Sequence, residues 1–206
     1  RAYSKYLRQA GIPFSETYMI ETLSRNAGIT RDVISLFEEF FDPERQSKKS
    51  AVTRLQKRIA ATLDNVKNLD EDRILRRFVN LVDSTLRTNF YQTDENDHRK
   101  SYVSFKFDSA NIDDLPLPRP MREIFVYSPR MEGVHLRGGK VARGGIRWSD
   151  RREDFRTEIL GLMKAQMTKN AVIVPVGAKG GFVLKQPPVS GGREALQEEG
   201  IACYKL

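Results

Sequence analysis

The sequence predicts an α+β chain in which a helical bundle segment precedes an α/β domain. Along the first ninety residues, apolar residues recur at intervals of three and four, the spacing of helices with one buried face. From residue 101 onward they alternate or form short runs, as strands do. Residues 92–100 are polar and unpatterned, so we place a helical segment at residues 1–91 and a second domain at residues 101–206.

Capping and stop signals divide the first segment into five helices. The first ends at Gly11-Ile12-Pro13, and Ser15 caps a second that stops near Asn26-Ala27-Gly28. Thr30 caps a third helix, which ends at Asp42-Pro43 because the residue before a proline is pushed out of helical geometry. Two longer helices follow, the second starting near Asp70, with apolar stripes formed by Val52, Leu55, Ile59, Leu63 and Val66, and by Ile74, Phe78, Leu81, Val82 and Leu86.

The second segment begins with strands. Val103, Phe105 and Phe107 alternate with polar residues, which predicts a strand with one buried face. The runs Ile124-Phe125-Val126 and Val134-His135-Leu136 predict two more strands.

A helix and a glycine-rich region complete the second segment. Ser149 and Asp150 are placed to cap a helix with Phe155, Ile159, Leu162, Met163 and Met167 on its apolar stripe. We then expect a strand at residues 171–176, a loop at residues 177–181 and a strand at residues 182–184. A helical pattern from residue 193 runs to residue 206 without a polar cap, so we expect the natural protein to continue.

The composition narrows the class of protein. At 206 residues and 39% hydrophobic, the chain can bury a core, and no apolar run approaches the roughly 18 residues of a membrane span. The start lacks the charged head and apolar core of a signal peptide, so we expect a cytoplasmic protein. One cysteine, Cys203, and two histidines, His98 and His135, predict no disulfide and no metal site.

The net charge of +8 is unevenly distributed. Residues 1–118 hold 19 Lys+Arg against 18 Asp+Glu, and residues 119–206 hold 16 against 9. The positive excess therefore lies with the glycine-rich segments, which suits a small anion such as a carboxylate or phosphate. We expect no nucleic-acid partner, because aromatic residues for base stacking are not interleaved with the basic cluster.

The run Gly177-Ala178-Lys179-Gly180-Gly181 is the strongest local signal for a site. Glycines on both sides let a backbone approach a ligand closely, and a lysine confined there can act as acid, base or electrophile towards a carbonyl. A hairpin turn with a solvated lysine is the alternative. A phosphate-cradling loop fits less well, because the spacing Gly-x-x-x-x-Gly-Lys-Ser/Thr is absent and Phe182 follows the glycines.

Two further segments carry candidate anion-binding residues. Arg143, within a glycine-basic run at residues 138–147, has the planar guanidinium that grips a carboxylate with two hydrogen bonds. Gln166 and Lys169 are three residues apart near the end of a helix and so share a face. A solvated basic turn, and a lysine that only complements the helix dipole, are the corresponding alternatives.

Together these segments resemble the substrate-binding domain of the glutamate dehydrogenase family. The resemblance rests on Ala142-Arg143-Gly144-Gly145-Ile146-Arg147, Gln166-Met167-Thr168-Lys169-Asn170-Ala171 and Gly177-Ala178-Lys179-Gly180-Gly181, in that order. The run Val141-Ala142-Arg143-Gly144-Gly145-Ile146-Arg147-Trp148-Ser149-Asp150 is most similar to the large NAD-specific bacterial branch. Residues 6–13 and 69–78 also resemble the helical stretch that precedes the catalytic region of that branch, so the resemblance covers nearly the whole chain.

The resemblance implies a role for each candidate residue. Lys179 matches the catalytic lysine, which polarises the oxo group and helps the imine form or hydrolyse. Lys169 matches the lysine that pairs with the substrate α-carboxylate, and Gln166 matches a further contact to that end. Arg143 stands where the family usually has a lysine for the side-chain carboxylate, so glutamate specificity rests on an arginine here. The interval from Lys169 to Lys179 is also shorter than in the ordinary hexameric enzymes.

The resemblance further implies the activity and the parts that lie elsewhere. We expect oxidative deamination of L-glutamate to 2-oxoglutarate and ammonia with NAD, by a homo-oligomeric full-length enzyme of amino-acid catabolism. The catalytic aspartate of the family should follow this chain, and no Gly-x-Gly-x-x-Gly is present, so we expect NAD to bind a domain outside it. The chain alone should not transfer hydride. Two alternatives stay open: a non-catalytic domain that binds small carboxylates or phosphate, and a nucleic-acid binder.

Overall fold

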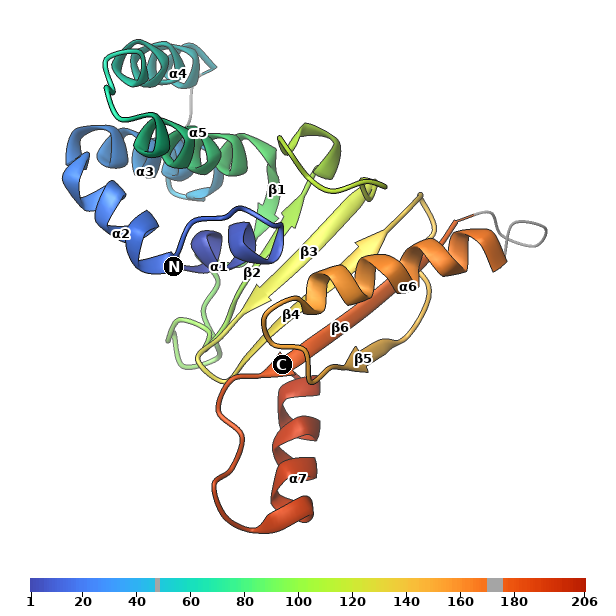
Figure 1. The fold of residues 1–206 in the computed structure, drawn as a ribbon. Coiled ribbons are helices and arrows are strands. Elements are labelled where there is room, and N and C mark those ends of the chain that lie inside the picture. Colours follow the sequence, from blue (N-terminus) through green and yellow to red (C-terminus); the bar gives the residue numbers. More distant parts are fainter. Residues whose placement is uncertain (47–48, 170–175) are drawn as a thin grey trace.

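A computed structural model describes residues 1–46, 49–169 and 176–206. Within these ranges the chain forms seven α-helices, one short 3-10 helix and a six-stranded sheet (Figure 1). In chain order the elements are α1 (Ala2–Gln9), α2 (Glu16–Arg25), α3 (Ala27–Phe41), α4 (Lys49–Leu63), α5 (Leu69–Ser84), β1 (Thr85–Thr88), β2 (Val103–Phe107), η1 (Ser109–Asn111), β3 (Arg122–Tyr127), β4 (Met131–Arg137), β5 (Ile146–Trp148), α6 (Phe155–Lys169), β6 (Ala178–Leu184) and α7 (Gly192–Tyr204).

The sheet is mixed, with the strand order β1-β2-β3-β4-β6-β5. The first five strands of this order pair antiparallel, and the edge strand β5 runs parallel to β6. A parallel pair needs a crossover connection, and here α6 provides it on its way from β5 to β6. The described residues therefore combine a helical N-terminal region with an α/β unit, as the two periodicities in the sequence predict.

One face of the sheet is covered by α1 and α6 (Figure 1). The predicted alternation in β2 is confirmed, because Phe105 and Phe107 are buried against this layer. Aromatic side chains of α1 pack on these strand residues. The ring centroid of Tyr6 lies 4.6 Å from that of Phe107 and 5.5 Å from that of Phe125. The ring centroid of Tyr3 lies 4.7 Å from that of Phe105. We call this side the helix face of the sheet.

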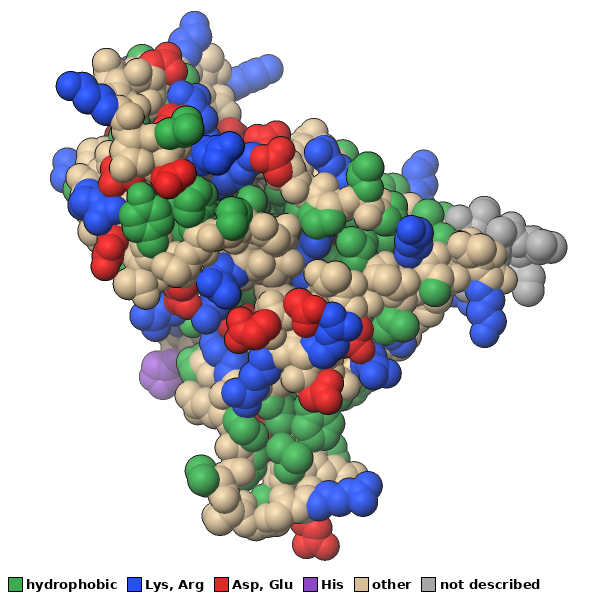
Figure 2. Space-filling view, viewed as in Figure 1, with side chains coloured by type: hydrophobic (Ala, Val, Ile, Leu, Met, Phe, Trp, Pro, Cys, Tyr) green, Lys and Arg blue, Asp and Glu red, His purple; other side chains and the backbone are tan. Residues whose placement is uncertain are grey.

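The opposite side, which we call the second face, carries the alternate residues of the same strands. Lys106, Ile124 and His135 lie on it, and all three are half-buried. At the β4–β6 end, α7 packs on this face through Cys203, which joins a small apolar cluster with Phe182. The N-terminal end of α7 projects away from the sheet, and hydrophobic side chains gather where the helix joins the molecule (Figures 1 and 2).

The helices α3, α4 and α5 share a second apolar core. They pack against one another through one stripe each, as the spacing of apolar residues predicts. Leu36 and Ile59 are almost fully buried there. The buried members of this core are Ile29, Val33, Leu36, Leu55, Ile59, Leu63, Leu75 and Val82.

The predicted helix boundaries hold in part. Ser15 caps α2 as expected, because its Oγ accepts a hydrogen bond from the backbone N of Tyr18 at 3.1 Å. The cap assigned to Thr30 was wrong: α3 already begins at residue 27, and the Thr30 hydroxyl donates instead to the carbonyl of Leu23 at 2.7 Å. Leu86 was wrongly placed in the fifth helix, since it lies in β1.

The division of the chain at residues 92–100 stays a prediction. The sheet and its core extend across that stretch, because β1 precedes it and pairs with β2 beyond it. In the described part of the chain, no helix is long and apolar enough to cross a membrane, and no group of three potential metal-ligating side chains is present.

Candidate functional site

Lys179 lies in a strand rather than in a loop. The prediction of a loop at residues 177–181 was wrong, because β6 starts at residue 178 and runs on through residue 184. Glycines are unusual inside a strand, and here they mark a close approach of α6. A Cβ at Gly177 would lie 2.3 Å from the carbonyl oxygen of Met163, and one at Gly181 would lie 2.3 Å from Cδ1 of Ile159. The glycines therefore let α6 lie directly on the strand that carries Lys179.

Gln166 fixes the end of α6 to this strand. Its Oε1 accepts a hydrogen bond from the backbone N of Ala178 at 3.2 Å. Such a bond contributes about 1 kcal/mol net, and it sets the distance between the helix and the residue preceding Lys179. Two of the four candidate residues are thus brought together by a contact that the sequence did not predict.

The loop that carries Arg143 reaches the same point. Gly144, the next residue, has φ +89°, and a Cβ there would lie 2.0 Å from the carbonyl oxygen of Ala178 and 3.3 Å from Oε1 of Gln166. Only glycine combines this left-handed backbone with so close a contact. The loop is therefore pressed against the junction of α6 and β6.

A further backbone contact sets the position of Lys179 relative to this loop. The N of Gly180 donates to the carbonyl oxygen of Gly145 at 3.1 Å. A Cβ at Gly145 would lie 3.9 Å from Nζ of Lys179, so the ammonium group lies over the loop. Lys179 is half-buried, and the register places it on the helix face of the sheet opposite Leu136.

Lys169 lies one turn beyond Gln166, in the last turn of α6, and is exposed. Arg143 is also exposed. Across residues 1–46, 49–169 and 176–206, no acidic side chain forms an ion pair with Arg143, Lys169 or Lys179. The predicted strand at residues 171–176 lies outside the described residues except for Val176, which is not in a strand.

The N-terminus of α6 is held by a distant residue. The expected cap at Ser149 and Asp150 was wrong, since the helix starts five residues later, at Phe155. Gln9 of α1 occupies the role: its Oε1 accepts from the backbone N of Arg156 at 3.2 Å, and its Nε2 donates to the carbonyl of Arg152 at 2.9 Å. Sequence reasoning could not find this contact, because the two segments are more than 140 residues apart.

Glu158 ties the edge strand β5 to α6, a role that sequence reasoning missed. Its carboxylate pairs with Nε of Arg147 at 2.5 Å and accepts from the hydroxyl of Ser149 at 2.5 Å. A weak signal was available in the sequence, because Arg147 of β5 and Ser149, the residue after that strand, are two positions apart and so can face the same side. The contact holds the strand that follows the Arg143 loop in place.

A buried ion pair between Arg156 and Glu123 anchors α6 to the sheet, and it was also missed. Both side chains are fully buried. Burial opposes the charge of Arg156, but the field of Glu123 and its hydrogen bonds outweigh that effect and raise the pKa of the guanidinium. The parity of the strand carried the signal, since Glu123 alternates with Ile124 and so faces the core with Phe125.

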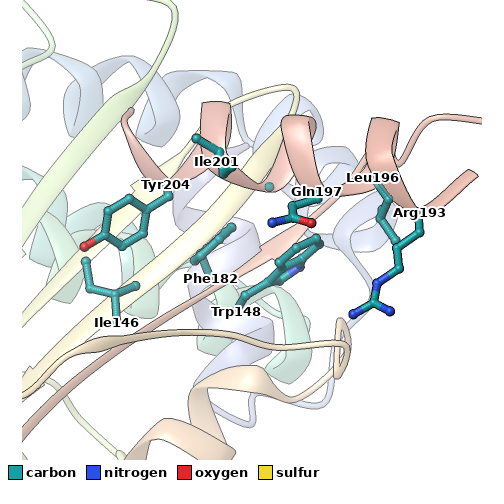
Figure 3. A pocket seen from close by; sticks show the side chains of 9 residues that line it. Ile146, Trp148, Phe182, Arg193, Leu196, Gln197, Ile201 and Tyr204 are labelled. Carbon is teal, nitrogen blue, oxygen red and sulfur yellow. The ribbon is translucent and has the colours of Figure 1, made fainter. Parts of the chain in front are cut away.

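An apolar cleft of about 470 Å³ lies between α7, β5 and β6 (Figure 3). Trp148 and Phe182 form its floor, and Leu196, Ile201 and Tyr204 of α7 face them (Figure 3). By the strand register these floor residues lie on the second face, on the other side of the sheet from Lys179. The cleft is therefore separate from the cluster of candidate residues.

Comparison with known proteins gives the family context. The family model described as bacterial NAD-glutamate dehydrogenase, catalytic domain, matches residues 58–206, and the one described as glutamate dehydrogenase, helical motif 3, matches residues 1–43. Proteins named NAD-specific glutamate dehydrogenase from Halomonas elongata, Pseudomonas aeruginosa and Mycobacterium tuberculosis are each 54% identical to the whole of this chain. The chain spans only 13% of the length of each of these relatives.

Proposed function

Because the chain belongs to the family of bacterial NAD-glutamate dehydrogenase catalytic domains, we propose that it supplies the substrate pocket of an enzyme that deaminates L-glutamate oxidatively to 2-oxoglutarate and ammonia. The observation that carries the proposal is the hydrogen bond from Ala178 to Gln166. It places the end of α6, which bears Lys169, beside the strand that bears Lys179. Three cations without acidic partners among the described residues then border one junction of the fold.

In this proposal Arg143 and Lys169 hold the two carboxylates of the substrate. The guanidinium of Arg143 meets the side-chain carboxylate with two N–H groups, which fixes both distance and plane. Lys169 pairs with the α-carboxylate, and Gln166 contacts the same end. Holding both carboxylates fixes the orientation of the α-carbon, and so the direction of its C–H bond.

Lys179 acts on the reacting carbon. When the C–N bond has been oxidised to an imine, water adds to that carbon and ammonia leaves, giving the oxo acid. The half-buried ammonium of Lys179 donates a hydrogen bond to the oxygen that forms, which stabilises charge developing on it. In the reverse direction the same donor polarises the oxo group for attack by ammonia.

The relatives are named NAD-specific, and NAD, when bound, would supply the hydride acceptor for this oxidation. The residues of this chain do not fit a dinucleotide site, because no strand is followed by Gly-x-Gly-x-x-Gly and the start of a helix. β6 is followed instead by Pro187 and Pro188 before α7. The proposal therefore places NAD, and the family's catalytic aspartate, in other parts of the full-length protein.

Cellular context is part of the proposal. We place the full-length enzyme in the cytoplasm as a homo-oligomer that functions in amino-acid catabolism. Mass measurement of the purified full-length protein in solution tests the oligomeric state, and fractionation of the source cells tests the location.

The test is NAD reduction by L-glutamate with the full-length protein, compared with the Lys179→Ala and Lys164→Ala variants. Lys164 lies exposed on α6 away from the junction, so it serves as the matched control. We expect Lys179→Ala to lower kcat at least about a hundredfold, the scale of a lost general catalyst, and Lys164→Ala to leave it unchanged. If the folded full-length protein fails to reduce NAD with every acidic amino acid tested, the dehydrogenase activity is rejected. A domain that binds small carboxylates without catalysis is then favoured.

A further inference from the structure

The second face of the sheet carries a row of residues across four strands. The register pairs Arg87 of β1 with Lys106 of β2, Lys106 with Ile124 of β3, and Ile124 with His135 of β4. Directly opposed residues on neighbouring strands have Cβ atoms about 4.5–5.5 Å apart, so Arg87 and Lys106 are immediate neighbours of like charge. Like charges in this arrangement destabilise a sheet unless something compensates them.

Two more cations lie two residues along the same strands. Arg122 of β3 pairs in register with Arg137 of β4, and both share the parity of Ile124 and His135 and so the same face. We call the set formed by Arg87, Lys106, Arg122 and Arg137 the basic face. Arg122 has an acidic partner, since its Nη1 lies 2.8 Å from Oδ1 of Asp108.

The other three cations of the basic face have no ion pair within the described part of the chain. Partial burial, and then the fields of Arg87, Arg137 and Arg122, lower the pKa of the Lys106 ammonium. Burial and the charge of Arg137 likewise lower the pKa of His135. Both directions agree with the register: positive charges are concentrated here, with Asp108 as the acid beside them.

The surroundings of the basic face favour a polypeptide as its partner. Ile124 is a half-buried apolar residue on the same face, and it offers a contact that a phosphate backbone would not use. Of the aromatic side chains of these strands, Phe105, Phe107 and Phe125 are buried on the helix face, and Tyr127 is half-buried on that same face. They are therefore not available to stack with nucleic-acid bases.

We propose that the basic face docks an acidic polypeptide segment, whose carboxylates pair with Arg87, Lys106 and Arg137 and whose apolar residues cover Ile124. Charge complementarity would fix its register. The docked segment lies across the sheet from Lys179, so this surface is distinct from the proposed substrate pocket and does not depend on it.

Zero-length cross-linking of the full-length protein tests the proposal. A carbodiimide joins an amine to a carboxylate only when the two are in contact, and digestion followed by mass spectrometry identifies both peptides. We expect the Lys106 amine to be joined, at low salt, to an aspartate or glutamate that lies outside residues 85–137, which excludes the neighbouring Asp108. The product should decline in 1 M salt, where the Debye length falls to about 3 Å.

Substitutions that change only the charge of the basic face test its role without removing Lys106. Arg137→Glu retains Lys106 and removes a like charge beside it, so the sheet should fold, while the yield of the Lys106 product should fall at least about tenfold. Arg99→Glu, a substitution outside the basic face, should leave the yield unchanged.

Two outcomes overturn the proposal. In the first, Lys106 gives no cross-link and is acetylated as fast as the exposed Lys100 at both low and high salt, which means that the face is bare. In the second, duplex DNA but no polypeptide protects Lys106 from acetylation, which assigns the face to nucleic acid.

Discussion

Arg156 of α6 and Glu123 of β3 form a two-pronged ion pair inside the protein, with Nε to Oε1 at 2.5 Å and Nη2 to Oε2 at 2.8 Å. The ring of Tyr6, from α1, lies 5.8 Å from the guanidinium carbon. Three elements therefore meet at one buried charge pair, and α6 reaches the candidate site from this anchor.

We expect Arg156→Ala to lower the free energy of unfolding by about 3–5 kcal/mol, because it leaves the Glu123 carboxylate buried without a partner. The double variant Glu123→Leu with Arg156→Met should recover most of that loss, since it removes both charges. Urea unfolding of the single and double variants measures the difference. Equal destabilisation by both would show that packing, and not the unpaired charge, sets the cost.

Gly144→Ala should disrupt the site. The new Cβ would lie 2.0 Å from the Ala178 carbonyl, and the left-handed backbone adds about 1–2 kcal/mol of strain, so the Arg143 loop must move. We expect the KM for glutamate to rise. Gly161→Ala is the matched control on α6: a Cβ there meets no atom within 4 Å, and alanine should stabilise the helix by about 0.5–1 kcal/mol. Equal kinetic effects of the two substitutions would contradict the close packing of the loop.

The role of Arg143 is tested with two substrates. Arg143→Ala should reduce kcat/KM for L-glutamate by roughly 10- to 100-fold, because it removes about 1.5–3 kcal/mol of charge-assisted hydrogen bonding. L-Norvaline, which has the same carbon chain without the side-chain carboxylate, should be used equally well by both proteins. Lys140→Ala, an exposed basic neighbour, is the control. A parallel loss with both substrates would place Arg143 elsewhere in the mechanism.

Cys203 should be almost inert in the folded protein. Burial, and then its hydrogen bond to Glu199 at 3.3 Å, raise the pKa of the Cys203 thiol to about 11. At pH 8 roughly one thousandth of such a thiol is thiolate, so iodoacetamide should react at least about a hundredfold more slowly than with a free cysteine. Glu199→Gln should speed the reaction, and denaturant should abolish the protection. Rapid labelling of the native protein would rule out the raised pKa.

The raised pKa of Cys203 also makes the free energy of unfolding depend on pH. Because the folded pKa of Cys203 is raised, the thiol contributes stability below the unfolded value of 9.0, and this contribution is lost as the pH rises towards 11. Cys203→Ser should flatten the stability profile in that range, measured by thermal unfolding at stepped pH.

Local patterns in the sequence predicted the elements that local forces determine. Ser15 capped its helix, and the alternation around Phe105 marked a strand with the correct buried face. β1 was missed because its partner lies fifteen or more residues further along, and because Leu86 extended a helical spacing by chance. Pairing with a distant strand supplied the hydrogen bonds that ended the helix.

The candidate site shows the same division. The motifs identified Arg143, Gln166, Lys169 and Lys179, and their roles remain predictions, while the structure brings Gln166 and the Arg143 loop to the strand of Lys179. The glycine-rich run was expected to be a loop because glycine weakens isolated strands. Contacts with α6 reverse that preference, and no local pattern reports a helix more than ten residues away.

The aromatic layer of α1 has a consequence for where this protein can be divided. The match to the catalytic-domain family begins at residue 58, whereas the side chains that shield Phe105, Phe107 and Phe125 begin at Tyr3. The start of the family match therefore differs from the start of the segment that packs around the sheet. If residues 58–206 were fused to another polypeptide, the side of Phe105, Phe107 and Phe125 that α1 covers would be exposed to solvent. A segment that keeps this aromatic layer covered therefore has to include α1, although α1 lies outside the matched catalytic-domain region.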